Sequence, residues 1–328
     1  MWTSRNLENV SPARERDAVK IGMVGLGRMG GSMTVRLLRN GHEVVAFDPV
    51  EEARLTAGEA GAKTGASLEE MVEALEPPRI VWLMVPAGRV TEDSINKLTT
   101  LLAEGDTIID GGNSNWKESR RRSEELKEKG IAFLDCGTSG GVYGLENGYC
   151  LMVGGDHEAF DRAEPVFAAL APENGYAWVG DSGAGHFVKM VHNGIEYGLL
   201  AAYAEGFELM KGMSEFELDL PTIAGIWRYG SVVRSWLLDL LVEAYETDAD
   251  LSHVSGYVED SGEGRWTVTT AIEEGIPAPI TALALFNRFA SRQDESYAAK
   301  VIAALRHEFG GHAIRKGRSA EARPGGEL

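Results

Sequence analysis

Short apolar runs and longer amphipathic segments alternate through the first half of the chain, and this alternation predicts a parallel α/β sheet. The run at Ile80–Val85 is apolar throughout, which is typical of a strand buried on both faces. Helical spacing occurs at Met29–Asn40 and His157–Leu170, and charged helical segments precede two of the later strands. The expected strands are Val19–Val24, Val44–Phe47, Ile80–Val85, Thr107–Asp110, Ala132–Asp135, Cys150–Val153 and Tyr176–Val179.

The pattern changes after Gly185, where strand signals nearly vanish. The stretch Gly185–Met213 contains no proline and predicts one helix of unusual length. We therefore expect an α/β domain over residues 19–183 and an all-α domain over residues 184–313, between a flexible extension at 1–18 and a flexible tail at 314–328. The further expected helices are Leu220–Tyr229, Val232–Tyr245, Trp266–Glu274, Ile280–Ser291 and Tyr297–Phe309.

One face of the long helix is polar where a buried helix would be apolar. Lys189, His192, Asn193, Glu196 and Tyr197 stand at positions i, i+3, i+4, i+7 and i+8. A potential base, Lys189, and a potential acid, Glu196, lie two turns apart, so this face suggests a site where protons move. The opposite face is apolar and is expected to pack; it carries Phe187, Val188, Val191 and Ile195.

A glycine-rich turn is expected between the first strand and the first helix. Its sequence is Gly25-Leu26-Gly27-Arg28-Met29-Gly30, the GxGxxG spacing of a dinucleotide-binding turn in a Rossmann-type α/β domain. The first glycine permits the tight turn, the second lets the backbone approach the pyrophosphate, and the third lets helix and strand pack closely. The amides at the start of the helix would then face the anion.

An acidic residue at the end of the second strand bears on which dinucleotide is bound. Asp48 stands 18 residues after Gly30, where a carboxylate can accept hydrogen bonds from the adenosine ribose and would repel a 2′-phosphate. This favours NAD over NADP. Arg54 lies nearby but is expected to be a solvated helix residue.

The balance of charges excludes some partners. A net charge of −18, from 50 acidic and 32 basic residues, argues against non-specific binding of nucleic acid, which needs a basic surface. A few arginines can still form a local pocket for a small anion. Neither a signal-peptide run nor a membrane-spanning run is found, so we expect a cytoplasmic protein with no membrane partner. The two cysteines, Cys136 and Cys150, fit a reducing compartment and are expected to be small buried residues.

Several segments together resemble the decarboxylating 6-phosphogluconate dehydrogenases, from about Lys20 to His312. The length is similar to that of the short-chain branch, which has a single helical domain. The resemblance implies oxidative decarboxylation of 6-phospho-D-gluconate to D-ribulose 5-phosphate and carbon dioxide, with reduction of NAD, in the pentose phosphate pathway. The segments that carry it are GLGRMG, IIDGGNSNW (Ile108–Trp116), FLDCGTSGG (Phe133–Gly141), HFVKMVHNGIEY (His186–Tyr197) and GRWT (Gly264–Thr267).

The same resemblance implies roles for the polar helix face. Lys189 would be the general base that takes the proton from the hydroxyl on carbon three, for which its amine has to be neutral. Glu196 would be the general acid that protonates the enediol left after carbon dioxide departs. No metal is expected, because the keto group formed by oxidation accepts the electrons and no dense set of metal ligands is found.

The remaining site residues are also implied by the resemblance. Asn113 would bridge cofactor and substrate, the loop Ser139–Gly141 would hold the carboxylate end, and Tyr197 and Arg288 would bind the phosphate. The implied cofactor-binding residues are Gly25, Leu26, Gly27, Arg28, Met29, Gly30, Asp48, Val85, Pro86, Ala87 and Asn113. The implied substrate-binding residues are Asn113, Ser139, Gly140, Gly141, His192, Asn193, Tyr197, Arg288, Arg306 and His312.

The C-terminal sequence RHEFGGH resembles a tail that completes the active site of a partner subunit in this family. Arg306 and His312 would thus act in trans, in a homodimer or a higher homo-oligomer, and the helical domain would serve both substrate binding and dimerisation. The chain departs from the long members of the family in one loop. Ser261 replaces a lysine that contacts phosphate there, and Glu263 adds an unexpected negative charge. Arg265 could compensate, or could be a structural partner of Trp266.

Two other functions stay open. A non-decarboxylating β-hydroxyacid dehydrogenase would share the glycine turn, but a short acid needs neither the phosphate arginines Arg288 and Arg306 nor a proton donor such as Glu196. A non-catalytic NAD-binding regulator is the second alternative, against which the pairing of Lys189 with Glu196 argues. Release of carbon dioxide along with reduced cofactor discriminates among the three.

Overall fold

The computed structural model describes residues 18–315 and divides the chain into two compact units, Met1–Gly194 and Ile195–Leu328. Nearly all of the predicted extension at 1–18 and tail at 314–328 lies outside the described residues. The boundaries predicted at 19–183 and 184–313 stay predictions. Each unit is described by itself, and helix α8 (Ala184–Gly212) contributes residues to both.

Unit 1 contains an eight-stranded sheet in the order β3-β2-β1-β4-β5-β6-β7-β8. Neighbouring strands are parallel except β6 and β7, which pair antiparallel from Leu134↔Gly155 to Ser139↔Cys150. The prediction of a parallel sheet is therefore wrong at this one pair. The strands are β1 Lys20–Val24, β2 Glu43–Phe47, β3 Lys63–Thr64, β4 Ile80–Leu83, β5 Thr107–Asp110, β6 Ala132–Ser139, β7 Cys150–Gly155 and β8 Tyr176–Gly180.

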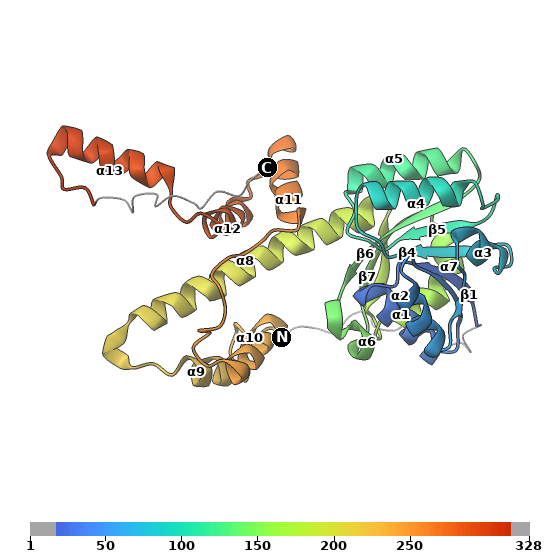
Figure 1. Cartoon of the computed structure of the whole chain (residues 1–328), viewed down its shortest axis with the longest axis horizontal. Coiled ribbons are helices and arrows are strands. Elements are labelled where there is room, and N and C mark those ends of the chain that lie inside the picture. Colours follow the sequence, from blue (N-terminus) through green and yellow to red (C-terminus); the bar gives the residue numbers. More distant parts are fainter. Residues whose placement is uncertain (1–17, 316–328) are drawn as a thin grey trace, which may run out of the picture. The chain divides into compact units, whose positions relative to one another are not determined.

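Helices cover both faces of the sheet (Figure 1). Buried side chains of α1, α2 and α7 pack on one face, and those of α3, α4 and α5 pack on the other. This is the doubly wound Rossmann-type arrangement that the alternating pattern predicts. The helices are α1 Arg28–Arg39, α2 Glu51–Glu59, α3 Leu68–Glu73, α4 Arg89–Thr99, α5 Trp116–Lys127, α6 Gly144–Asn147 and α7 His157–Leu170.

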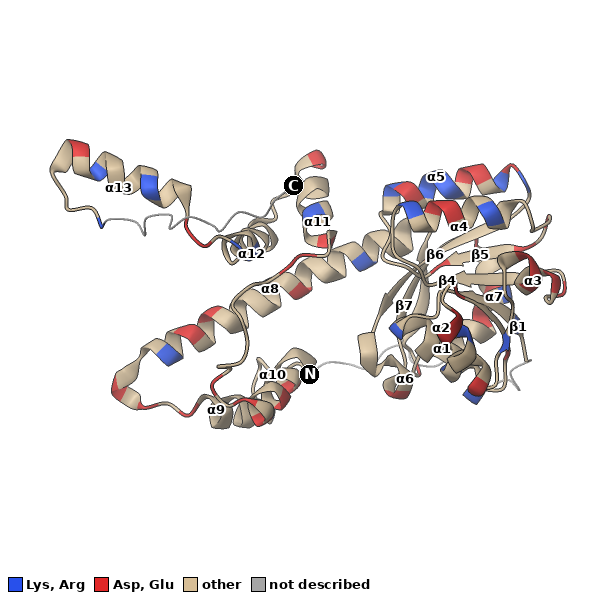
Figure 2. Cartoon of the chain, in the orientation of Figure 1, with Lys and Arg blue, Asp and Glu red and all other residues tan. Residues whose placement is uncertain are grey.

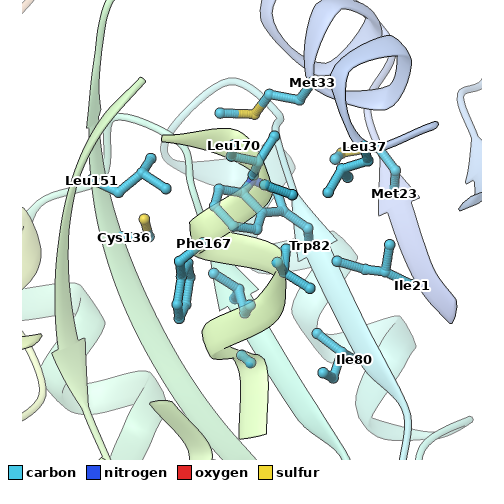
Figure 3. Close-up of a cluster of buried hydrophobic side chains, with 14 of the residues drawn as sticks. Ile21, Met23, Met33, Leu37, Ile80, Trp82, Cys136, Leu151, Phe167 and Leu170 are labelled. Carbon is cyan, nitrogen blue, oxygen red and sulfur yellow. The ribbon is translucent and has the colours of Figure 1, made fainter. Parts of the chain in front are cut away.

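The larger core of unit 1 is centred on Trp82 of β4 (Figure 3). The indole meets the ring of Phe167 edge-on, with the ring centroids 6.0 Å apart. Cys136 lies in the same cluster and is fully buried, as expected, and burial raises the pKa of its thiol. The expectation for Cys150 is wrong. It is the first residue of β7, directly at the strand end, and its side chain is exposed while the following residues are buried.

Unit 2 is helical throughout its described secondary structure, apart from a short 3₁₀ turn after α8. The long helix predicted at Gly185–Met213 is confirmed within one residue at each end. Helix α10 begins four residues later than predicted, because Ser235 caps it by accepting a hydrogen bond from the amide of Leu238. The remaining helices are α9 Leu220–Trp227, α10 Trp236–Thr247, α11 Glu263–Glu273, α12 Pro279–Ala290 and α13 Tyr297–Gly310.

The apolar face predicted to pack on α8 is instead largely open. Phe187 is 39% exposed and Ile195 is 60% exposed, and Val188 and Val191 are only partly buried. Within its own unit, Phe187 meets the ring of Trp116 edge-on at 5.7 Å. In the single chain, the expected packing is therefore partial at Phe187 and is not seen at Ile195. Exposed apolar side chains along one helix are typical of a surface that another molecule covers.

Basic and acidic residues cluster along α4 and α5 (Figure 2). Arg121 of α5 forms ion pairs with Glu92, Glu118 and Glu125. Hydrogen bonding from Arg121 holds the pKa of the Glu92 carboxyl below its usual range, although burial opposes the effect. Within residues 18–315, no helix is both long and apolar enough to cross a bilayer.

Asp260 forms an ion-pair cluster with two arginines of unit 2, and neutralising its carboxylate is expected to lower the stability of the protein. Its buried carboxylate pairs with Arg265 at 2.7 Å and with Arg292 at 2.6 Å. The hydrogen bond from Arg265 is the main reason that the pKa of Asp260 lies well below its usual value. We expect Asp260→Asn to lower the melting temperature at pH 7 by about 2–4 °C.

The difference in melting temperature between wild type and Asp260→Asn is expected to depend on pH. A depressed folded-state pKa means that the stabilisation is complete above the unfolded-state pKa of about 3.9 and is lost as pH falls further. Thermal melts of wild type and variant at pH 7 and near pH 3.5 check this. The gap between them is expected to narrow at the lower pH, and an equal melting temperature at pH 7 would show that the cluster contributes no stability.

Candidate functional site

The glycine-rich turn adopts the conformation that its sequence predicts. Gly25 has φ +91°, and a Cβ atom placed on it would lie 2.3 Å from the carbonyl oxygen of Met84. A Cβ on Gly30 would lie 1.9 Å from the carbonyl oxygen of Gly25, so both positions require glycine. Gly27 is exposed, and a Cβ there would meet no protein atom within 4 Å. The turn therefore has closed packing behind it and open space in front of the first amides of α1, which fits a pyrophosphate.

Asp48 follows β2 and lies against this turn. Its Oδ2 atom accepts a hydrogen bond of 2.7 Å from the amide of Leu26, and its Oδ1 atom accepts one of 2.8 Å from Val50. Each carboxylate oxygen has a second lone pair, so the group can still accept from a ribose hydroxyl. Arg54 is a residue of helix α2, as expected, and it is half-buried. Its Nη1 atom donates to the carbonyls of Asp48 and Pro49 and so ties down the turn after β2.

The open space at Gly27 predicts that an alanine there weakens NAD binding without disturbing the fold. Gly27 has φ −61°, which alanine also adopts, so Gly27→Ala is expected to fold and to shift the melting temperature by no more than about 2 °C. The added methyl group would stand where the pyrophosphate approaches, so NAD affinity should fall at least about tenfold. Fluorescence titration with NADH measures the affinity. Gly30→Ala is the matched control, because its clash with Gly25 should cost stability. Unchanged NADH affinity in Gly27→Ala would contradict the assignment.

Two further loops follow the ends of β4 and β5 and carry predicted cofactor residues. Thr91 is fully buried and donates from Oγ1 to the carbonyl of Pro86 at 2.9 Å, which holds the segment Val85–Ala87. In the next loop, Asp110 accepts from the amide of Gly112 at 3.1 Å and from the hydroxyl of Ser114 at 2.7 Å. These bonds flank the half-buried Asn113 and fix the backbone on both sides of it.

A buried arginine supports the loop of Asn113 from behind. Arg122 is 3% exposed, and it lies 3.5 Å from Oδ2 of Asp110 and 2.9 Å from Oε2 of Glu92. Sequence reasoning missed Asp110 and Arg122. An aspartate at the end of an apolar strand and an arginine inside a charged helix give little signal until the fold brings them together.

The predicted substrate residues of unit 1 gather where β6 meets the start of α8. The hydroxyl of Ser139 lies 3.5 Å from Nε2 of His192, and Nδ1 of His192 lies 3.0 Å from Oδ1 of Asn193. Lys189 packs against β6, since a Cβ on Gly137 would lie 2.4 Å from the Cβ of Lys189. The loop Gly140–Gly141 follows with φ +129° and +53°, conformations that favour glycine. Hydroxyl, imidazole, amide and amine groups thus lie together and could bind a polyhydroxy acid.

The predicted phosphate residues of unit 2 form a second group. The guanidinium of Arg288 stacks on the ring of Tyr197 at 3.5 Å, and its Nη1 atom donates to the carbonyl of Glu259. The hydroxyl of Tyr197 accepts a hydrogen bond of 3.3 Å from the amide of Ser261. Gly264 is pressed against the same ring, where a Cβ would lie 2.5 Å from Cε2 of Tyr197. Arginine, tyrosine and a loop amide are groups that can hold a phosphate.

The side chain of Glu263 is buried and hydrogen-bonded to a neighbouring residue. The residue is 2% exposed, and its Oε2 atom accepts a hydrogen bond of 2.6 Å from the hydroxyl of Ser261. Arg265 does not supply the compensation suggested for it, and its main partner is not Trp266. It pairs with Asp260 and stacks on the ring of Phe289 at 4.4 Å.

The two predicted tail residues lie apart from the second group in the single chain. Arg306 is part of α13, His312 follows that helix, and both are exposed. Among residues 195–315, no hydrogen bond or ion pair joins either side chain to Tyr197, Ser261 or Arg288. Their role therefore stays a prediction that depends on a partner subunit.

Comparison with known proteins gives the same family for both parts of the chain. Residues 20–180 match the NAD binding domain of 6-phosphogluconate dehydrogenase, and residues 185–321 match the C-terminal domain of 6-phosphogluconate dehydrogenase. The structure is similar to that of 6-phosphogluconate dehydrogenase from Plasmodium falciparum, with a TM-score of 0.77 and 28% identity, over 92% of this chain and 67% of that one.

Two relatives match over nearly their whole length. The NAD(+)-dependent, decarboxylating 6-phosphogluconate dehydrogenase of Haloferax volcanii is 44% identical over 91% of this chain and 99% of its own. The YqeC protein of Bacillus subtilis (strain 168), whose name assigns it provisionally to the 6-phosphogluconate dehydrogenases, is 46% identical over 91% of this chain and 100% of its own.

Proposed function

The chain belongs to the 6-phosphogluconate dehydrogenase family of oxidoreductases, and we propose that it converts 6-phospho-D-gluconate to D-ribulose 5-phosphate and carbon dioxide with reduction of NAD. The observation that carries the proposal is the polar face of α8. It combines an amine at Lys189 and a carboxyl at Glu196 with neighbouring groups that can hold a sugar acid.

Lys189 is the base of the oxidation step in this proposal. Its neutral amine takes the proton of the hydroxyl on carbon three as hydride leaves that carbon for the nicotinamide, which supplies the hydride acceptor when bound. Ser139, His192 and Asn193 hold the neighbouring hydroxyls and carboxylate, so that the carbon–hydrogen bond is oriented. Close packing of Lys189 on Gly137 supports the role, because it limits where the amine can stand.

Loss of carbon dioxide then follows from the chemistry of the 3-keto acid. The bond between carbons one and two breaks, its electrons move toward the new carbonyl, and protonated Lys189 returns its proton to that oxygen. The resulting enediol needs a proton on carbon two of the original acid, which becomes carbon one of the product. Glu196, two turns along α8 and half-buried, is the proposed donor and has to be protonated at this stage. As Glu196 gives its proton to that carbon, the now neutral Lys189 takes back the proton of the hydroxyl on carbon three, and the carbonyl of the product forms there.

The terminal phosphate is assigned to the group around Tyr197 in unit 2. Arg288 carries the positive charge, and the hydroxyl of Tyr197, which accepts from the amide of Ser261, keeps its own hydrogen as a further donor. Because Glu263 is already bonded to Ser261 and buried, its charge does not have to face the phosphate. A phosphorylated sugar acid is therefore the proposed substrate class.

NAD is proposed as the cofactor in preference to NADP. Asp48 is anchored beside the glycine turn by the amide of Leu26, and a 2′-phosphate at that position would meet its negative charge. Like charges placed together cost several kcal/mol, so kcat/KM with NAD should exceed that with NADP at least about tenfold.

A dimer or higher homo-oligomer is proposed for the working form. Helix α13 has no buried side chain, and Ile302, Leu305 and Phe309 on it are 59%, 59% and 78% exposed. Contact with a second copy would cover these residues and could bring Arg306 and His312 to the partner's phosphate site. Activity of a monomer, or full activity after truncation before Arg306, would contradict this part of the proposal.

Initial rates with a panel of substrates test the function as a whole. We expect rapid reduction of NAD with 6-phosphogluconate, and a kcat/KM at least about 100-fold lower with gluconate, because a phosphate bound by a charged donor contributes several kcal/mol. A short 3-hydroxy acid is expected to react still more slowly. Preference for the short acid would favour the non-decarboxylating alternative, and no activity with any acid would favour the regulator.

A further inference from the structure

A buried carboxylate in the sheet holds the start of helix α8. Asp135 of β6 is fully buried. Its Oδ1 atom accepts a hydrogen bond of 2.7 Å from the amide of Gly183, and its Oδ2 atom accepts one of 2.8 Å from the amide of His186. Both amides belong to the first turn of α8 or directly precede it, where backbone N–H groups have no partner within the helix.

The helix start also lies unusually close to the sheet. A Cβ on Gly185 would lie 2.1 Å from the carbonyl oxygen of Asp135, and one on Gly154 would lie 2.6 Å from the amide of Gly185. One turn further on, the Cβ of Lys189 is next to Gly137. Because a helix is stiff over so short a distance, any shift of its start displaces Lys189 by a similar amount.

The carboxylate suits this position better than its neutral analogue would. Its two oxygens serve two amides at once, and the positive end of the α8 dipole balances the buried charge. An asparagine has one oxygen and one amide NH₂ group. One of the two backbone donors would then face another donor, and the helix start would move or fray to relieve it.

We infer that Asp135 is a positioning residue for the reaction, because it fixes where α8 begins and so the depth at which Lys189 stands against β6. The inference rests on the proposed role of Lys189 as base. It assigns no contact with substrate or cofactor to Asp135. The buried carboxylate of Asp135 thus affects the rate of the reaction and not the binding of cofactor or substrate.

The neighbouring strand supplies a matched control. Asp110 pairs with Asp135 in the register of β5 and β6, and it is equally buried. It holds the loop of Asn113 through Gly112 and Ser114 and lies next to Arg122 of α5, whereas Asp135 bonds to the start of α8. Asp110→Asn and Asp135→Asn therefore remove the same charge from adjacent positions that support different segments.

Steady-state kinetics of the full-length protein with NAD and 6-phosphogluconate test the inference. A misplacement of about 1 Å can cost about 100-fold in rate, so Asp135→Asn should lower kcat about 30-fold or more. The affinity for NADH should stay within about threefold, and the deuterium isotope effect on kcat with substrate labelled at carbon three should increase. Asp110→Asn should instead raise KM for NAD and substrate, because it loosens the loop of Asn113.

Hydrogen exchange separates the anchoring from the chemistry. Amides of residues 183–188 should exchange faster in Asp135→Asn and remain as in wild type in Asp110→Asn. Faster exchange in Asp135→Asn, together with wild-type turnover in Lys189→Met, would overturn the proposed role of Lys189 as base. The anchoring of α8 by Asp135 would still hold in that case. Unchanged exchange together with a kcat within threefold of wild type would overturn the inference.

If Asp135→Asn does not fold, a second variant tests the positioning role of Asp135. Asp135→Glu keeps the charge but extends the side chain by one methylene, so it should fold with α8 displaced. We expect a kcat about tenfold below wild type with NADH affinity retained. Wild-type kcat and isotope effect in Asp135→Glu, or a kcat loss matched by an equal loss of NADH binding, would contradict a positioning role.

Discussion

Replacing Lys189 by methionine is expected to lower kcat at least about 1,000-fold, the largest effect of any single substitution in the proposed site. Methionine has a similar length but cannot accept a proton. The hydroxyl on carbon three would then keep its proton as hydride leaves, which raises the barrier of the oxidation itself. Stopped-flow absorbance should show that the first turnover is as slow as later ones, with no burst of reduced cofactor.

Controls distinguish this loss from a structural defect. Lys189→Met should retain NADH affinity and the melting temperature of wild type, since the amine contributes to the reaction and not to the cofactor site. Lys211→Met, an exposed lysine near the other end of α8, should keep wild-type turnover. A kcat of Lys189→Met within tenfold of wild type would remove this residue from the role of base.

Replacing Glu196 by glutamine is expected to lower kcat about 100- to 1,000-fold by a different route. Oxidation and loss of carbon dioxide do not need the acid, so a first burst of reduced cofactor should persist. Protonation of the enediol would then become slow and limit turnover. The deuterium isotope effect on kcat should therefore fall toward one, whereas in Lys189→Met it should be fully expressed.

Glu205→Gln is the matched control for this variant, because Glu205 is an exposed glutamate on the same helix. It should leave both the burst and kcat unchanged. Glu196→Gln without a burst would place the residue in the oxidation step instead. A variant with normal turnover would exclude Glu196 as the acid.

The main elements could be predicted because their apolar periods are strong. Trp82 and its neighbours form an uninterrupted run, and α8 contains no proline over its 29 residues. The antiparallel pairing of β7 was missed because β6 was expected to end at Asp135. It continues to Ser139, and only ten residues then separate it from Cys150, too few for a parallel crossover.

The site could be predicted only where a local motif reports the chemistry. The glycine turn and the polar face of α8 lie within short segments whose spacing carries the signal. The supports for these segments are tertiary contacts, and their partners are far apart in sequence. Arg122 bonds to Glu92, 30 residues earlier in the chain, and Asp135 bonds to amides 48 and 51 residues further along it. No pattern of one segment predicts such pairs.

Sequence patterns also leave open what covers an apolar helix face. The apolar face of α8 was expected to pack, but periodicity identifies such a face without showing its partner. Phe187 and Ile195 are exposed in the single chain instead. Their exposure agrees with the proposed oligomer, in which a second copy would supply the missing contact.

The ratio of carbon dioxide to reduced cofactor tests the proposed function most directly. Purified protein with NAD and 6-phosphogluconate labelled with carbon-13 at carbon one should release one labelled carbon dioxide for each NADH formed. The phosphorylated product should be unlabelled ribulose 5-phosphate. Reduced cofactor with the label retained in a 3-keto acid would contradict the account and identify a dehydrogenase that does not decarboxylate.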